Sequence, residues 1–322
     1  MINSVRNTVL SILNKNNYGY ISPSDFNLFA KQAQLDIFDN YFFNYNYQIQ
    51  KENARQSGTG YADIKKGYEE VIEMFGVTKY LPTTSTLLNT VNLGNTFYLP
   101  AQLYTGDDYY LINKVLAYET TKATGATTAV LANNLEDNTA TFISDGVKVG
   151  DVVFNLRTPS SLQNATVAQV VSETVLLLSS DIFTINASAY VVFGPKQNEL
   201  DKVTHGKITM LNNSMLTAPN RLFPAYTQEG GILTAYPSAL FSGIQCQYIR
   251  YPKDPKWTYV TLTNGEPVFD SGQSDFQDFE LSLDDQVELV NKILQYAGMS
   301  IREIQAVQFG KSEEQYNDQQ EK

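Results

Sequence analysis

A single histidine and a single cysteine limit the chemistry available to this 322-residue chain. His205, with Asp201 before it and Ser214 after it, has the residue types of a hydrolase base, orienting acid and nucleophile. The sequence has no Gly-x-Ser-x-Gly elbow, however, and the three residue types are common in loops. Cys246 lies among apolar neighbours in a strand-like pattern, which favours a small buried side chain over a reactive thiolate. We therefore expect no catalytic nucleophile.

Carboxylates toward the C-terminus are the second group of residues with chemical potential. They have the types needed to bind calcium or to act as an acid and base pair. The members are Asp270, Asp275, Asp278, Glu280, Asp284 and Asp285. EF-hand spacing is absent, and acids at a helix start already complement the helix dipole. We expect these acids to serve structure or interaction, with no metal, no cofactor and no enzymatic activity.

Two further motifs are better explained by structure than by ligand binding. Ser57-Gly58-Thr59-Gly60 has amides for a phosphate, but no strand precedes it and no Gly-Lys-Ser/Thr follows, which favours an ordinary loop. The aromatic run from Tyr41 to Tyr47 has the rings to stack on bases but lacks interleaved Lys or Arg. Packing or a subunit interface is the better interpretation of the aromatic run.

Charge and hydropathy exclude other classes of protein. The net charge is -11, the wrong sign for a protein that grips a nucleic acid backbone. From residue 264 onward there are 13 acidic and 4 basic residues, so the acidity is concentrated near the C-terminus. No apolar run approaches the roughly 20 residues of a membrane span, and the first residues lack the apolar stretch of a signal peptide. We expect the chain to be cytoplasmic when it is made.

Helical periodicity marks both ends of the chain. Apolar spacing predicts helices over residues 4–13, 23–47 and 64–75, the second opened by Ser22-Pro23-Ser24-Asp25, in which Ser22 is a cap. Ser282 and Asp285 resemble a capping box for a helix that ends at Gly298. A short second helix is expected over residues 301–308, and the polar residues 311–322 are expected to be disordered until bound.

Period-two patterns predict strands in the middle of the chain. The expected strands are 96–99, 109–116, 127–131, 141–143, 151–156, 165–171, 175–178, 189–193, 207–211, 231–235 and 243–251. The close spacing of the strands before residue 195 indicates a small antiparallel barrel or sandwich inserted into the chain.

The expected fold class is α+β: a helical bundle from the N- and C-terminal segments, antiparallel β regions, and an inserted small β-barrel or sandwich. The expected division has a helical N-terminal part (1–112), the inserted β domain (113–195), strands and C-terminal helices that complete the core (196–310), and a flexible acidic tail (311–322).

Two blocks of sequence resemble structural proteins of crAss-like gut bacteriophages. The blocks are NKNNYGYISPSDF (14–26) with AQLDIF (33–38), and YIRYPKDPKW (248–257) with DFEL (278–281) and ILQYAG (293–298). This resemblance implies a ring or adaptor protein of the virion, beneath the portal of a short-tailed phage. Such adaptors form twelve-fold rings matching the portal, surround the DNA channel and dock on the portal by a C-terminal segment, and they bring no catalytic residues.

The resemblance also implies partners and sites. Its partners would be the portal protein, other ring or tail proteins and further copies of the chain, with genomic DNA passing through without sequence-specific binding and no membrane. The residues expected to dock on the portal are Ile301, Ile304, Val307, Phe309 and Tyr316. The residues expected at the subunit interface are Phe26, Phe29, Ile37, Tyr41 and Tyr45.

Two other classes share some of these features. Another tail or minor head protein of the same virion would differ from an adaptor mainly in copy number and position. A carbohydrate-acting enzyme is less favoured, since it would need two carboxylates held near each other in a cleft.

Overall fold

The computed structural model describes residues 1–13, 21–55, 62–84, 94–156, 163–263 and 265–301. The chain divides into a helical unit, Met1–Phe75 with Pro252–Lys322, and a β unit, Gly76–Tyr251. These boundaries differ from the expected ones at residues 112 and 195. The reason is that strand β3 (Tyr109–Tyr118) pairs with both β14 (Gln245–Arg250) and β10 (Gln197–Glu199), which ties chain from both sides of those boundaries into one sheet.

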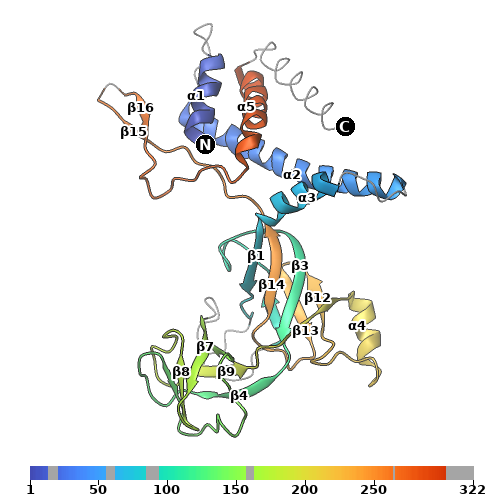
Figure 1. The fold of residues 1–322 in the computed structure, drawn as a ribbon. Helices are drawn as coiled ribbons and strands as arrows, with labels where there is room; N and C mark the ends of the chain where they lie inside the picture. Colours follow the sequence, from blue (N-terminus) through green and yellow to red (C-terminus); the bar gives the residue numbers. More distant parts are fainter. Residues whose placement is uncertain (14–20, 56–61, 85–93, 157–162, 264, 302–322) are drawn as a thin grey trace. The chain divides into compact units, whose positions relative to one another are not determined.

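The helical unit joins the two ends of the chain (Figure 1). Its helices are α1 (Ile2–Leu13), α2 (Pro23–Arg55), α3 (Ala62–Glu73), the 3-10 turn η2 (Leu283–Asp285) and α5 (Gln286–Ile301). Helix α5 packs against α1 and α2, and α3 packs against α2. The expected apolar stripes face inward, since Val9 of α1, Ala33 of α2 and Ile293 of α5 are fully buried.

Local capping explains where α2 begins. The Asp25 amide donates to Ser22 Oγ at 3.2 Å, and Ser22 Oγ donates to the Asp25 carboxylate at 2.6 Å. Pro23 follows the cap at a position where its missing amide hydrogen costs nothing. The predicted helix start is therefore confirmed.

Two four-stranded sheets form the first core of the β unit. One has the order β1 (Gly76–Tyr80), β14, β3, β10, and the other has the order β11 (Asp201–Lys202), β12 (Ala225–Glu229), β13 (Ile232–Tyr236), β2 (Thr96–Tyr98). All pairs are antiparallel except β11 with β12. Residues from both sheets, including Phe97, Leu233 and Cys246, share one buried cluster.

A third, six-stranded antiparallel sheet curls into a half-barrel. Its order is β4 (Thr121–Ala126), β9 (Ala189–Phe193), β6 (Val152–Asn155), β7 (Gln163–Val170), β8 (Val175–Leu178), β5 (Asn134–Glu136). The curl brings Ala129, just after β4, into a bridge with Glu136 of β5. Every residue of β9 is buried, because Tyr190 and Val192 face the inner core while Val191 and Phe193 pack beside Tyr118.

Three strand predictions are wrong. Residues 207–211 belong to helix α4 (His205–Asn212), which Thr204 caps by accepting a hydrogen bond from the Lys207 amide. Residues 127–131 hold only an isolated bridge, and residues 141–143 enter a turn that buries Phe142. Residues 207–211 alternate in polarity as a strand would, although they form a helix.

The predicted helix end at Gly298 is also wrong. Helix α5 continues past Gly298 to Ile301. A glycine costs helix stability without forbidding the helix. Ile301 also continues the apolar spacing set by Leu294 and Ala297. Residues 302–308 and 311–322 lie outside the described residues.

Candidate assembly interface

Five of the six carboxylates singled out in the C-terminal segment have a structural partner: Asp270, Asp275, Asp278, Glu280 and Asp285. Asp278 accepts the Met1 amino group at 2.8 Å and the Ile2 amide at 2.7 Å, so it caps α1. Burial alone would raise the pKa of Asp278, but these hydrogen bonds and the one from the Phe279 amide outweigh burial and lower it. Glu280 accepts the Lys253 amide, and Asp285 accepts the Tyr41 hydroxyl. The acids therefore hold separate segments together.

Neither of the other chemical candidates assembles a reactive centre. Asp201 lies in β11, His205 opens α4 and Ser214 follows α4, and no hydrogen bond joins the side chains of these three described residues. Cys246 is fully buried in β14, and burial raises the pKa of its thiol to about 12. Over the ranges that the structure describes, no group of three metal-ligating side chains gathers.

Trp257 anchors the segment that returns from the β unit into the helical unit. Its amide donates to Asn27 Oδ1 at 2.8 Å, and its carbonyl oxygen accepts from Asn27 Nδ2 at 3.3 Å. Its indole N–H donates to Asn3 Oδ1 at 3.1 Å, and the Arg6 guanidinium lies 3.8 Å from the ring centroid. Trp257 thus connects the returning segment to α2 through its main chain and to α1 through its side chain.

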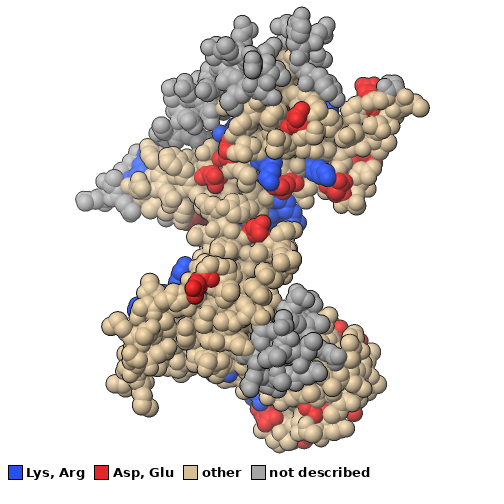
Figure 2. Space-filling view, turned by 180° about the vertical axis from the view of Figure 1, so that it is seen from behind, with Lys and Arg blue, Asp and Glu red and all other residues tan. Residues whose placement is uncertain are grey.

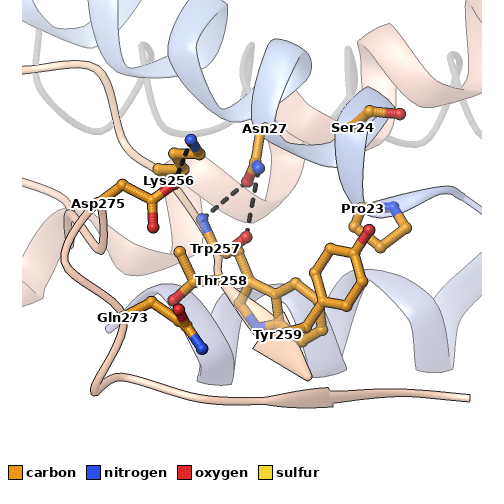
Figure 3. Close-up of a pocket in the computed structure, with 9 residues that line it drawn as sticks. All are labelled: Pro23, Ser24, Asn27, Lys256, Trp257, Thr258, Tyr259, Gln273 and Asp275. Atoms are coloured by element: carbon orange, nitrogen blue, oxygen red, sulfur yellow. Dashed lines mark hydrogen bonds and ion pairs between the residues drawn. The ribbon is translucent and has the colours of Figure 1, made fainter. Parts of the chain in front are cut away.

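A shallow pocket of about 320 Å³ lies beside this anchor (Figure 3). Its lining comes from the start of α2 and from two stretches of the returning segment: Pro23, Ser24, Asn27, Lys256, Trp257, Thr258, Tyr259, Gln273 and Asp275. The polar groups are already engaged, since Asn27 holds Trp257 and Lys256 pairs with Asp275 at 2.5 Å. Asp275 is the one carboxylate in this lining, so the pocket lacks the acid pair that glycoside hydrolysis needs.

A β-hairpin, called the hairpin arm and defined as residues 259–269, begins at Tyr259 in the lining of this pocket. It consists of β15 (Tyr259–Thr261) and β16 (Pro267–Phe269), which pair only with each other among the described strands. The Trp257 ring stacks on Tyr259 and Phe269 at centroid distances of 5.5 and 6.0 Å. Val260, Leu262 and Val268 are exposed beyond this anchor, and an isolated hairpin is only marginally stable in water.

A second exposed apolar surface, the α4 surface (residues 204–223), lies on the β unit. Met215 and Leu216 are 100% and 97% exposed, and Phe223 is 76% exposed. The side of the β unit that carries α4 is mostly uncharged in the view from behind (Figure 2). Contiguous exposed apolar side chains are typical of surfaces that bind a partner.

The residues expected at the subunit interface divide into two groups. Phe26, Ile37 and Tyr41 are buried in the core of the helical unit, and burial beside Asp285 raises the pKa of Tyr41. Phe29 and Tyr45 are half-buried, and the Tyr45 hydroxyl donates to Glu69 at 2.9 Å. Within the folded chain, only this second group has side-chain area left for a neighbour.

Of the residues expected to dock on the portal, Ile301 ends α5. The other four, Ile304, Val307, Phe309 and Tyr316, lie outside the described residues. The sequence analysis missed both exposed surfaces. A signal was present for the α4 surface, because residues 203–224 contain no acid and have apolar residues without a helical or strand period.

A scan against protein-family models and a search of the curated proteins found no match to this chain. None of the helices in the described part of the chain is both long and apolar enough to cross a membrane.

Proposed function

We propose that this protein is a non-enzymatic virion protein that forms a ring between the portal and the tail of a short-tailed phage. The observation that carries the proposal is the pair of exposed apolar surfaces, the hairpin arm and the α4 surface, on separate units of one chain. A subunit with such surfaces needs partners to cover them. The resemblance to crAss-like phage proteins supplies the kind of assembly.

Two different surfaces suit a ring. In a closed ring related by rotational symmetry, one patch of each subunit contacts a different patch of the next subunit. A ring subunit therefore needs two unlike faces. The hairpin arm and the α4 surface are unlike in secondary structure, since one is a β-hairpin and the other is a helix with the segment after it. The ring would be twelve-fold, to match the portal.

The two blocks that resemble phage proteins meet within the helical unit. The Gln34 side chain, from the first block, bonds the Lys253 carbonyl oxygen and the Glu280 amide, from the second. The resemblance therefore covers residues that pack together, which supports the inference that they form the helical bundle of the adaptor. The β unit, with the curled sheet as its inserted barrel, would carry contacts peculiar to this virion.

The net charge of -11 suits a DNA conduit, because like charge keeps passing DNA from adhering to the channel wall. Residues beyond Ile301 would dock on the portal. In particular, Ile304, Val307, Phe309 and Tyr316 are the apolar anchors available in an otherwise polar stretch.

Copy number in purified virions tests this function directly. Quantitative mass spectrometry should find this protein and the portal protein in equal numbers. Several-fold excess would indicate a different tail or head protein, and absence from the particle would overturn the virion role.

Truncation tests the docking segment. Because α5 runs to Ile301, a chain ending at Ile301 keeps the described core and should fold normally but no longer co-purify with the portal. A folded truncation that still binds the portal would contradict the docking assignment. Mutating Ile304 and Phe309 to Ser in the full chain provides a second variant with the core intact.

A further inference from the structure

We infer that the tip of the α4 surface, residues 214–218, inserts into the interfacial region of a membrane that carries anionic lipids. This inference does not rest on the proposed ring, and it goes beyond the partners implied by the resemblance, which include no membrane. It concerns the tip alone, so that the exposed Leu222 and Phe223 remain available to a neighbouring subunit.

The tip is a turn whose two largest side chains face solvent. The amides of Thr217 and Ala218 both donate to the Ser214 carbonyl oxygen, at 3.2 and 2.9 Å. Met215 and Leu216 therefore occupy the apex of the turn, where they are almost entirely exposed. Helix α4 and the segment after it lie at the periphery of the β unit (Figure 1). An apolar pair in such a place can enter an apolar phase without any rearrangement of the fold.

The backbone of the tip is also suited to a medium poorer in water. A main-chain polar group that enters lipid must be hydrogen-bonded within the protein, because lipid offers it no partner. Besides the two amides bonded to Ser214, the Asn213 amide donates to the Met210 carbonyl oxygen and the Ser214 amide donates to that of Leu211, both at 3.3 Å. The Thr217 hydroxyl donates to the same Leu211 oxygen at 3.2 Å. These bonds lower the cost of partial dehydration.

The charge around the tip favours an anionic surface. Residues 208–220 contain no charged side chain, and Lys207 and Arg221 stand at the two ends of this stretch. Lys207 is exposed, and its side chain pairs with no acid among the described residues. The Arg221 guanidinium donates to uncharged groups, Thr121 Oγ1 at 2.8 Å and the Ala239 carbonyl oxygen at 3.0 Å. Anionic head groups attract such cations, and the stretch has no acid to repel them.

The order of apolar and basic residues favours lipid over a protein partner. Cations at the ends of an uncharged stretch can stay at the head groups while the apolar residues between them reach the acyl boundary. Met210 adds apolar area beside the tip, because it lies about 200° round α4 from the buried Ile208 and is itself exposed. A lipid surface receives protruding side chains without a complementary shape, whereas a protein partner needs a well-packed pocket for them.

Vesicle flotation with the full-length protein tests the inference. Phosphatidylcholine vesicles with and without phosphatidylglycerol are supplied in excess at low salt. We expect the protein to float with the anionic vesicles, and about tenfold less of it to float with phosphatidylcholine alone. Added salt should weaken the binding to anionic vesicles, because it screens the attraction between cations and head groups.

Variants assign the binding to the tip. Met215→Ser combined with Leu216→Ser should leave thermal unfolding unchanged and lower the lipid-bound fraction about tenfold, since both residues are exposed and supply the inserted apolar area. Lys207→Glu should weaken flotation most at low salt. As the matched control, Ile143→Ser combined with Val149→Ser removes two exposed apolar side chains elsewhere in the β unit and should float as wild type does.

A second measurement distinguishes insertion from adsorption by charge alone. Met215→Cys is labelled with an environment-sensitive dye, while the native Cys246 stays unlabelled because it is buried and its thiol pKa is raised to about 12. Anionic vesicles should shift the emission of this dye to shorter wavelength. The same dye on Val149→Cys, an exposed position outside the α4 surface, should not respond.

Three results would each overturn the inference: no flotation of the wild-type protein with anionic vesicles, equal flotation of the Met215 and Leu216 double variant, or an unchanged emission at position 215. If the wild type ignores vesicles but the double variant loses binding to the portal or a tail protein, the tip contacts protein and the inference is again wrong. The copy number in virions tests the proposed function separately, so either conclusion can fail while the other stands.

Discussion

The side-chain amide of Gln34 in α2 donates a hydrogen bond of 2.8 Å to the main-chain carbonyl oxygen of Lys253. The same side chain accepts the Glu280 amide through Oε1 at 3.2 Å, and it is 1% exposed. Gln34→Ala would remove two partly buried hydrogen bonds to main-chain groups, so we expect a loss of about 2 kcal/mol in the free energy of unfolding. Urea denaturation followed by circular dichroism measures this loss.

Gln32→Ala is the matched control on the same helix. Gln32 is exposed and bonds only Asp36, so its replacement should change stability by less than about 0.5 kcal/mol. Equal losses in the two variants would contradict the assigned role of Gln34.

The cap that Asp278 places on α1 should make stability depend on pH. Because the folded state lowers the pKa of Asp278 below 3.8, its contribution is complete above that pH and is lost as pH falls through the folded pKa. Asp278→Asn should cost about 1 kcal/mol at neutral pH, and the difference from wild type should vanish in acid. Denaturation at a series of pH values checks this.

Asp254→Asn serves as the comparison for Asp278, since Asp254 pairs with Lys31 at an exposed position. Its cost should remain below about 1 kcal/mol. A cost for Asp278→Asn that stays constant into acid would refute the assignment.

A buried ion pair should matter far more than an exposed one in the β unit. Asp151, with its side chain 2% exposed, binds Lys122 Nζ at 2.7 Å and the Lys148 amide at 2.6 Å. Asp151→Ala would leave a partly buried cation without its partner, and we expect a loss of about 3 kcal/mol. Glu199→Ala, which breaks the exposed pair with Lys114, should cost under about 1 kcal/mol. Thermal unfolding of Asp151→Ala and Glu199→Ala measures the two losses. Similar melting temperatures for the two variants would contradict the greater importance of the buried pair.

Two glycines should respond oppositely to alanine. A Cβ at Gly125 would lie 2.4 Å from Asp137 Oδ2 and 2.7 Å from the Tyr190 hydroxyl, two atoms joined by a hydrogen bond of 2.8 Å. Gly125→Ala should therefore destabilise the curled sheet by about 1–3 kcal/mol. Gly206 in α4 has open space at its Cβ position, so Gly206→Ala should stabilise by up to about 1 kcal/mol. Calorimetry that ranks the two variants the other way would disprove the packing around Gly125.

Local signals predicted much of the secondary structure. Ser22 and Asp25 identify the start of α2 because the capping bonds join residues three apart. The run Ala189 to Phe193 was identified as a strand because continuous apolar, β-branched residues suit a strand buried on both faces. The strand prediction for Lys207 to Leu211 was wrong because these residues belong to α4, which buries one side chain, Ile208. A single buried residue gives no helical periodicity in the sequence.

Long-range relationships had no signal in the sequence. The residues around Gln34 do not indicate that its side chain bonds Lys253, because a hydrogen bond between residues far apart in the chain produces no spacing pattern in the sequence. Asp278 was recognised as an interacting acid, but its partner Ile2 lies 276 positions away. The exposure of Leu216 or Leu262 likewise follows from which neighbours the tertiary fold supplies, and an apolar residue alone predicts burial.

The anchor Trp257 and the buried Cys246 give this chain two built-in reporters. The sequence has one tryptophan and one cysteine, and they fall in different units. Indole emission, from a side chain 2% exposed in the helical unit, will shift to longer wavelength only when that unit opens. Thiol labelling will likewise begin only when the β unit opens. The order in which the two units come apart is therefore readable from the unaltered protein, without any added dye or substitution.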